Sequence, residues 1–274
     1  LMFSILDNIK LNNKTAIVTG GFGNIGMKIV ETLLELKCEV IVIDMDGPSV
    51  KQKIETFETK FNIKLNKELH FYNTNLASKD SIVELCEIIK GKYNKMDILI
   101  HSAALVGTSN LEGWSVPFED QSMEAFDLCM DINTKAPLLF FQSLIELFKK
   151  SECGKIINIS SIYGIRGNDF SLYEDTCMES PIAYSISKAS LNIMIQYLAS
   201  LYGKYNICFN NIVLGGIFRG QDEKFIERYN QKTPLGRMGT EDDIKGMISF
   251  LSSNLSNYVT GQNLVLDGGI TCKF

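Results

Sequence analysis

The sequence predicts an α/β fold in which a doubly wound parallel sheet of about seven strands carries helices on both faces. Short apolar, β-branched runs alternate with amphipathic segments of helix length, which is the order that a parallel sheet requires. A glycine-rich turn at residues 20–26 joins the first such run to the first helix. The 274 residues, 45% of them hydrophobic, can form one sizeable core, and no linker or internal repeat divides them. We therefore expect a single domain over residues 1–274.

Seven runs are candidate strands. Four of them are strongly apolar and β-branched, as in buried parallel strands: 15–19, 39–43, 98–100 and 155–159. Three have a weaker pattern: 70–72, 207–210 and 263–266. Helical periodicity occupies the segments between them, at about 24–36, 48–61, 79–91, 122–150, 182–203 and 240–252.

Two long stretches interrupt this alternation, at about 104–121 and 162–181. Loops of this length inside a compact domain are usually functional. Each follows the carboxyl end of an expected strand, where open α/β sheets bind ligands. We predict that both stretches are lid-like insertions over a bound ligand.

The composition argues against several classes of function. Lys and Arg number 27 against 32 Asp and Glu, so the net charge of −5 leaves no basic stripe for a nucleic acid. Two histidines and seven scattered cysteines without a Cys-x-x-Cys pair predict no metal site and no disulfide framework. The lack of a membrane-length apolar run and of a basic leader predicts no membrane contact and a cytoplasmic location. A small molecule is the expected partner.

The glycine turn and Asp44 together indicate a dinucleotide site. Glycines let the backbone approach a pyrophosphate closely, and the next helix offers unpaired N–H groups at its N-terminus. Asp44 ends the second strand, 18 residues after Gly26. A carboxylate there accepts hydrogen bonds from an adenosine ribose diol and repels a 2′-phosphate. These features predict a Rossmann-type domain that binds NAD rather than NADP.

Tyr184 and Lys188 stand four residues apart, and therefore on one face of the helix expected at 182–203. A phenol with a pKa near 10 exchanges protons poorly at neutral pH, whereas a nearby ammonium favours the phenolate. The pair therefore suits general acid/base chemistry. Ser161, just after the fifth strand, and Asn133, within the preceding long helix, sharpen this prediction.

In this order, the glycine turn, Asp44, Asn133, Ser161 and the Tyr184/Lys188 pair resemble the short-chain dehydrogenase/reductase family over nearly the whole chain. The resemblance implies that Tyr184 transfers the proton and that Ser161 polarises the substrate oxygen. Lys188 would hold the nicotinamide ribose and lower the pKa of Tyr184, and Asn133 would anchor a water relay. The family commonly assembles as a homo-oligomer, so we expect a dimer or a homotetramer.

The resemblance also implies the ligand contacts. The expected cofactor-binding residues are Gly20, Phe22, Asn24, Ile25, Gly26, Asp44, Asn75, Leu76, Ser102, Ala103, Ala104, Tyr184, Lys188, Gly216 and Ile217. The candidate substrate contacts are Ser161, Tyr163, Arg166 and Arg219.

The chain departs from the family's pattern at several of these positions. Asn24 stands where a middle glycine is usual, while Gly23 matches the spacing of the family's longer sugar-nucleotide branch. His101 begins the segment that usually reads Asn-Asn-Ala-Gly, and we expect it to be structural. The segment 214–217 reads Leu-Gly-Gly-Ile without the usual proline, which puts the rigidity of this loop in question.

The 23-residue separation of Ser161 from Tyr184 is longer than usual in the family. The insertion that lengthens it resembles oxidoreductases of bacterial surface-sugar pathways, such as flagellin-modification proteins of the legionaminic-acid type. This narrower resemblance predicts a role in carbohydrate biosynthesis.

Three hypotheses for the function follow. The leading one is an NAD-dependent oxidoreductase that transfers a hydride between the nicotinamide and a secondary alcohol or ketone of a polar, sugar-like substrate. A sugar-nucleotide epimerase or dehydratase with retained NAD would suit Gly23, but little chain follows the sixth strand to bind a nucleotide. A non-catalytic NAD-binding sensor or partner protein is the third, and the intact catalytic set argues against it.

Overall fold

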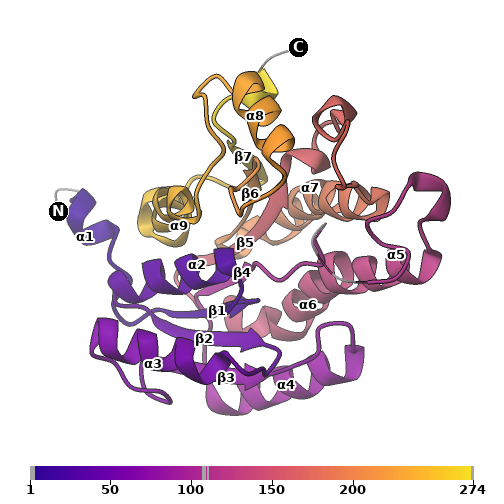
Figure 1. Cartoon of the computed structure of the whole chain (residues 1–274). Helices are drawn as coiled ribbons and strands as arrows, with labels where there is room; N and C mark the ends of the chain where they lie inside the picture. Colours follow the sequence, from indigo (N-terminus) through magenta and orange to yellow (C-terminus); the bar gives the residue numbers. More distant parts are fainter. Residues whose placement is uncertain (1–3, 107–108, 110, 273–274) are drawn as a thin grey trace.

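The computed structural model of the chain describes residues 4–106, 109 and 111–272. Within these residues one parallel sheet has the strand order β3-β2-β1-β4-β5-β6-β7 (Figure 1). Its members are β1 (Thr15–Thr19), β2 (Glu39–Asp44), β3 (Leu69–Asn73), β4 (Ile98–His101), β5 (Gly154–Ser161), β6 (Ile207–Leu214) and β7 (Gln262–Leu266). The strand order reverses direction between β1 and β4, so the predicted doubly wound sheet is confirmed.

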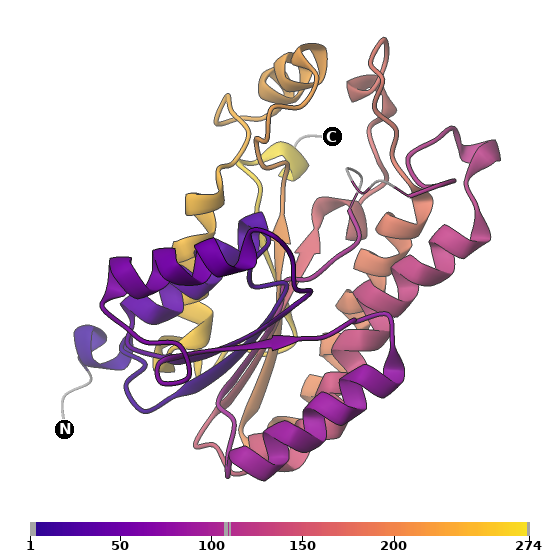
Figure 2. The ribbon, with the colours of Figure 1, turned by 60° about the horizontal axis from the view of Figure 1, so that its bottom comes forward.

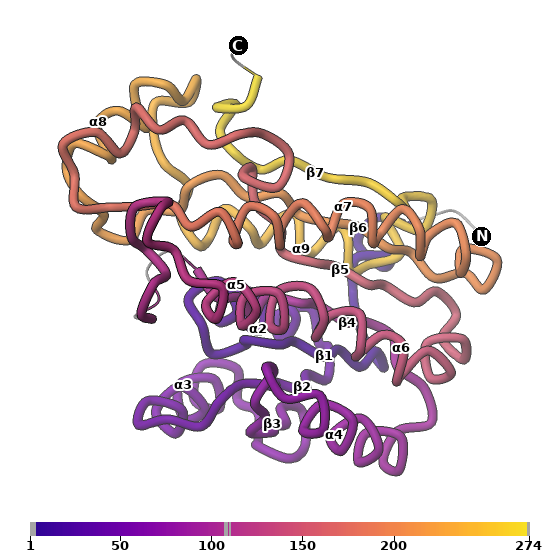
Figure 3. Tube along the Cα trace, turned by 90° about the vertical axis from the view of Figure 1, so that its right-hand side faces the viewer, coloured from indigo at the N-terminus to yellow at the C-terminus, as the bar shows by residue number. Residues whose placement is uncertain are grey.

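Helices cover both faces of the sheet. One face carries α2 (Asn24–Glu35), α3 (Val50–Phe61) and α9 (Lys245–Ser252). The other carries α4 (Lys79–Lys92), α6 (Ala136–Phe148) and α7 (Ile182–Tyr202), and Figure 3 looks onto this side. Each helix buries the apolar stripe that its periodicity predicts, so the sheet lies between two hydrophobic layers.

The pattern does not predict α1 (Ile5–Asn8) or α8 (Glu223–Lys232). α1 has four residues, and α8 has only three apolar residues among ten, so neither forms an apolar run that marks a helix. Asp222 caps α8, since its side chain accepts a hydrogen bond from the Lys224 backbone N–H. This cap is the local signal for α8 in the sequence.

The prediction of a single helix at 122–150 is wrong in one respect. The structure has α5 (Met123–Met130) and α6 joined by a π-helical turn at Asp131–Lys135. A π turn adds one residue to the helical repeat and commonly occurs at functional sites. Asn133 lies in this turn, and its amide reaches Ser187 of α7.

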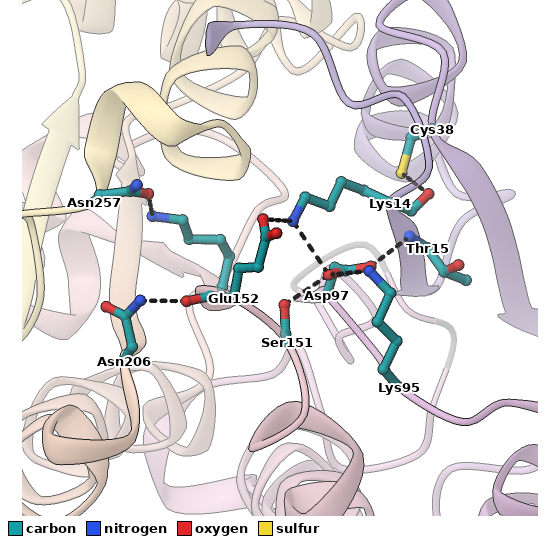
Figure 4. Close-up of polar contacts among 10 residues, drawn as sticks. Lys14, Thr15, Cys38, Lys95, Asp97, Ser151, Glu152, Asn206 and Asn257 are labelled. Carbon is teal, nitrogen blue, oxygen red and sulfur yellow. Dashed lines mark hydrogen bonds and ion pairs between the residues drawn. The ribbon is translucent and has the colours of Figure 1, made fainter. Parts of the chain in front are cut away.

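The amino ends of β1, β4 and β5 are held together by a polar network around Asp97 (Figure 4). Its carboxylate, 1% exposed, accepts hydrogen bonds from the Thr15 backbone N–H at 3.1 Å and from the Ser151 hydroxyl at 2.6 Å. Lys14 and Lys95 pair with the same carboxylate at 3.5 and 3.2 Å. A buried charge with this many partners fixes the strands at the edge opposite their carboxyl ends.

In the described part of the chain, no helix combines the length and the apolar character needed to span a bilayer. The same residues hold no grouping of three or more His, Cys, Asp or Glu side chains that could bind a metal ion.

Candidate active site

A cavity of about 1060 Å³ lies at the carboxyl ends of the strands. Every residue expected to bind the cofactor lines it: Gly20, Phe22, Asn24, Ile25, Gly26, Asp44, Asn75, Leu76, Ser102, Ala103, Ala104, Tyr184, Lys188, Gly216 and Ile217. Ser161, Tyr163 and Arg219 line it too. Figure 2 shows the insertion that follows β5 and the helix α8 projecting at the same end of the molecule. The topology therefore gathers into one cavity residues that are up to 200 positions apart in the sequence.

The glycine turn is pressed against the end of β4. Gly20 has a φ of +64°, and a Cβ there would lie 2.6 Å from the Ala103 Cα. A Cβ on Gly26 would lie 1.9 Å from the Gly20 carbonyl oxygen, so neither position accepts a side chain. No side chain caps the N-terminus of α2. Asn24, Ile25 and Gly26 of its first turn line the cavity, so the N-terminus of the helix is placed to receive a pyrophosphate.

Asp44 is fixed at the end of β2 by two backbone donors. Phe22 N–H and Met45 N–H each donate to one of its oxygens, both at 2.8 Å. Each carboxylate oxygen keeps a further lone pair, which fits the two hydroxyls of an adenosine ribose. Lys53, which the sequence analysis does not single out, also lines this end of the cavity and donates to the Phe22 carbonyl at 2.8 Å.

Tyr184, Lys188 and Ser161 meet where α7 crosses the end of β5. Burial raises the pKa of the Tyr184 phenol, and a hydrogen bond with Ser161 and the charge of Arg219 oppose this rise. Lys188 donates to the Ile159 carbonyl at 2.7 Å, and its Nζ lies 5.6 Å from the centre of the Tyr184 ring.

Burial acts on the pKa of both members of this pair. It lowers the pKa of Lys188 to about 8 and raises the pKa of Tyr184. The lowering of the Tyr184 pKa by a protonated Lys188 stays a prediction for the protein with its cofactor bound.

Asn133 lies behind the cavity rather than in its wall. Its side-chain oxygen accepts from the Leu105 N–H at 2.8 Å, and its amide donates to the Leu105 carbonyl at 3.1 Å and to the Ser187 hydroxyl at 3.0 Å. These bonds tie the segment after β4 to α7. A role for Asn133 in a water relay stays a prediction, since its side chain is occupied by protein partners.

The insertion contributes side chains to the opposite end of the cavity. Tyr163 and Tyr173 join their hydroxyls at 2.6 Å, and both line the cavity. Arg219 lines it as well and pairs with Glu241 at 3.4 Å. Arg166 is exposed and is not part of the lining, and its backbone N–H donates to the Ile162 carbonyl in the turn after β5. The expected contact of Arg166 with substrate therefore has no support from its position.

Of the polar residues that the insertion offers to a hydroxyl-rich ligand, Tyr173 lines the cavity. Tyr229 is missing from the sequence analysis, as is Lys53. Tyr229 lies in α8, which is itself not predicted, and it also lines the cavity. Residues 107, 108 and 110 of the predicted insertion at 104–121 lie outside the described residues.

His101 occupies the end of β4 directly beneath the cavity. It is 4% exposed, its Nδ1 lies 3.4 Å from the Thr19 hydroxyl, and its ring packs on Phe140 at 5.8 Å between centroids. Burial, and to a lesser degree the charge of Lys188, lowers the pKa of His101 to about 3. The imidazole is therefore neutral in the folded protein at physiological pH.

This neutral histidine predicts a pH dependence of stability. The unfolded chain takes up a proton near pH 6.5, whereas the folded chain does so only near pH 3, so stability is lost as the pH falls below 6.5. We expect His101 to lower the free energy of unfolding by about 1.4 kcal/mol between pH 7.5 and 5.5. Urea unfolding of the wild type and of His101→Asn at both pH values measures it. Equal pH dependence in the two proteins would contradict this assignment.

Comparisons with known proteins identify the family of the chain. Residues 21–271 match the family described as Enoyl-(Acyl carrier protein) reductase. The chain is 31% identical over 260 residues to the Post-translational flagellin modification protein A of Campylobacter coli, covering 94% of this chain and 98% of that protein. It is 30% identical over 266 residues to the 3-oxoacyl-[acyl-carrier-protein] reductase FabG of Rickettsia felis, covering 96% of this chain and 98% of that protein.

A solved structure is also similar along its whole length. It is a short chain dehydrogenase from Leptospira borgpetersenii with bound NAD⁺, 34% identical, with a TM-score of 0.84 and coverage of 99% of this chain and 98% of that one. The resemblance to flagellin-modification proteins that the insertion suggests is confirmed by the Campylobacter relative. With its cavity, its catalytic set and these relatives, the chain belongs to the short-chain dehydrogenase/reductase family of oxidoreductases.

Proposed function

We propose that this protein is an NAD(H)-dependent oxidoreductase that interconverts a secondary alcohol and a ketone on a polar, sugar-like substrate. One observation carries the proposal: Ser161, Tyr184 and Lys188 line the same cavity as the glycine turn and Asp44. A dinucleotide bound between Asp44 and Lys188 would bring its nicotinamide next to the Tyr184 hydroxyl.

In this mechanism NAD(H), when bound, supplies or accepts the hydride. Ser161 hydrogen-bonds the substrate oxygen, and the Tyr184 hydroxyl gives that oxygen a proton in reduction or takes one in oxidation. Lys188 is held by the Ile159 carbonyl at 2.7 Å and keeps further N–H groups for the ribose hydroxyls. A protonated Lys188 beside bound ribose would favour the phenolate, which the buried Tyr184 does not form easily by itself.

The preference for NAD rests on Asp44. Its carboxylate can accept from both ribose hydroxyls and would repel a 2′-phosphate, and the Leptospira relative carries NAD⁺. In Asp44→Ala we expect the affinity for NAD to fall by about 1.5–3 kcal/mol while the affinity for NADP rises. Titration of both cofactors against the wild type and the variant measures the switch. A wild type that prefers NADP would overturn the proposed cofactor.

The sugar-like substrate is supported by the polar lining beyond Ser161. Tyr163 and Tyr173 offer paired hydroxyls, and Arg219 offers a positive group for a phosphate or a carboxylate. The similarity to the Campylobacter protein points in the same direction.

Steady-state assays that follow NADH absorbance test the substrate. The panel holds sugar phosphates, nucleotide sugars and a 3-oxoacyl thioester, because the Rickettsia relative is a 3-oxoacyl-[acyl-carrier-protein] reductase. We expect the highest kcat/KM with a sugar derivative. Preference for the thioester would replace the sugar-like substrate, and turnover of a nucleotide sugar without net NADH would indicate an epimerase or dehydratase.

We also propose a homo-oligomer in the cytoplasm. Ile186, Ile193, Tyr197 and Leu201 form an exposed apolar stripe along α7, with exposures of 42%, 66%, 67% and 44%. Such a stripe on a helix is typical of a subunit contact. All seven cysteines are free thiols, which suits a reducing compartment. Light scattering on the purified protein measures the assembly, and a monomer at micromolar concentration would contradict it.

A further inference from the structure

The loop that follows β6 is bound by a side chain of α8. The Gly216 N–H donates to the Tyr229 hydroxyl of α8, with 2.5 Å between nitrogen and oxygen. The Gly216 carbonyl accepts from Gly239 N–H at 2.9 Å, and Gly215 N–H donates to the Leu266 carbonyl at 3.0 Å. Gly216 lines the cavity, and Tyr229 is only 2% exposed. The loop is therefore rigid although it lacks the family's usual proline.

The two glycines and Tyr229 fit each other in space. A Cβ on Gly216 would lie 2.9 Å from ring atoms of Tyr229. A Cβ on Gly215 would lie 3.0 Å from the Tyr229 hydroxyl and 2.8 Å from the Asp267 Cα. A proline at position 215 would meet the same atoms and would lose the bond to Leu266. The absence of side chains at Gly215 and Gly216 therefore leaves the space that the Tyr229 side chain occupies.

α8 connects this loop to the insertion. Lys232 pairs with Asp169 at 2.5 Å, and Arg228 pairs with Asp175 at 3.6 Å. On the buried side of α8, the ring of Phe225 packs edge-on against Tyr173 at 5.2 Å between centroids. Tyr229 therefore stands between the loop after β6 and the segment that reaches Tyr163.

The Tyr229 hydroxyl is suited to hold a neutral amide. Burial raises its pKa to about 12, so it remains a phenol at physiological pH. Its oxygen accepts the hydrogen bond from the Gly216 N–H.

We propose that Tyr229 is a positioning residue for the nicotinamide: its hydroxyl fixes Gly216 so that the backbone of the next residue, Ile217, meets the carboxamide of the cofactor. The inference rests on the proposed function, because it places the nicotinamide at this end of the cavity. In this chain a side chain of α8 restrains the loop after β6, which in the family's usual pattern contains a proline.

The test compares the binding of a ligand that contains the nicotinamide with the binding of one that lacks it. Tyr229→Phe removes the hydroxyl and keeps the ring that packs on Gly216. We expect the Kd for NADH to rise about tenfold, because the Gly216 N–H loses its acceptor, and the Kd for ADP-ribose, which has no nicotinamide, to stay within about twofold. Calorimetric titration of both ligands measures the split. Tyr258→Phe, on a side chain that is fully exposed, is the matched control and should change neither value.

A second variant approaches the same contact from the loop. Gly216→Ala pushes a methyl group against the Tyr229 ring and is expected to give the same selective loss of NADH affinity. Equal losses for NADH and ADP-ribose, or no loss for NADH, in these variants would overturn the assignment. A wild type that binds ADP-ribose or NADH at no measurable level would instead overturn the proposed function, so the two failures are distinguishable.

Discussion

Replacing Tyr184 by phenylalanine is expected to lower kcat by about 10²–10⁴-fold, because a general acid/base group typically contributes this much. The change removes one hydroxyl and leaves the ring beside Lys188, whose Nζ lies 5.6 Å from the ring centre. NADH binding should therefore stay within about twofold of the wild type. Steady-state turnover on the best substrate of the panel and a separate NADH titration measure the two effects.

Tyr258→Phe is a suitable control for this experiment. Its side chain is fully exposed and is not part of the cavity lining. We expect unchanged kinetics for it. Near-normal turnover of Tyr184→Phe would show that another group moves the proton.

Exchanging residues 164–181 for a short linker is expected to lower kcat/KM by at least about 100-fold, since small misplacements of substrate cost about this much. The exchange removes Tyr173, the partner of the Tyr163 hydroxyl, and the buried Leu172 that packs with Phe225 and Tyr229. Affinity for ADP-ribose should remain, because the glycine turn and Asp44 lie at the other end of the cavity. Unchanged kinetics on the substrate would contradict the lid.

A single substitution in the insertion tests the role of one hydroxyl without disturbing the fold of the segment. Tyr173→Phe keeps the ring on Phe225 and removes only the hydroxyl bonded to Tyr163. A rise in KM with little change in kcat is expected if this hydroxyl contacts substrate. Gly167→Ala, at an exposed position where a Cβ would meet nothing within 4 Å, serves as the control within the same segment. A Tyr173→Phe enzyme that behaves like Gly167→Ala would place the hydroxyl outside the substrate contacts.

The sheet and the cofactor end of the cavity could be predicted because they depend on interactions within short segments of the sequence. β-branched runs form buried parallel strands, and the carboxyl ends of such strands must share one edge. Gly20, Gly26 and Asp44 were therefore predictable from their order alone, and all three line the cavity. The candidate catalytic residues Ser161, Tyr184 and Lys188 were predicted from the resemblance to the family, in which such residues occur in the same order.

The substrate end could not be predicted in the same way. α8 has a polar composition, so its helix depends on a cap at Asp222 and on tertiary contacts that the sequence does not display. The pairing of Tyr163 with Tyr173 depends on how the insertion folds back, which no periodicity encodes. The raised pKa of Tyr184 depends on burial, which outweighs the hydrogen bond with Ser161 and cannot be seen in the spacing of Tyr184 and Lys188.

The Asp97 network separates the integrity of the sheet from the residues that would select the substrate. Asp97 binds Ser151 and Thr15 at the edge of the sheet opposite the cavity (Figure 4). Replacements in residues 164–181 or in α8 leave these bonds untouched, so selection on substrate choice need not trade against the integrity of the sheet. Mutational tolerance should accordingly be high in the insertion and low at Asp97, where loss of one carboxylate leaves two lysines without their shared partner.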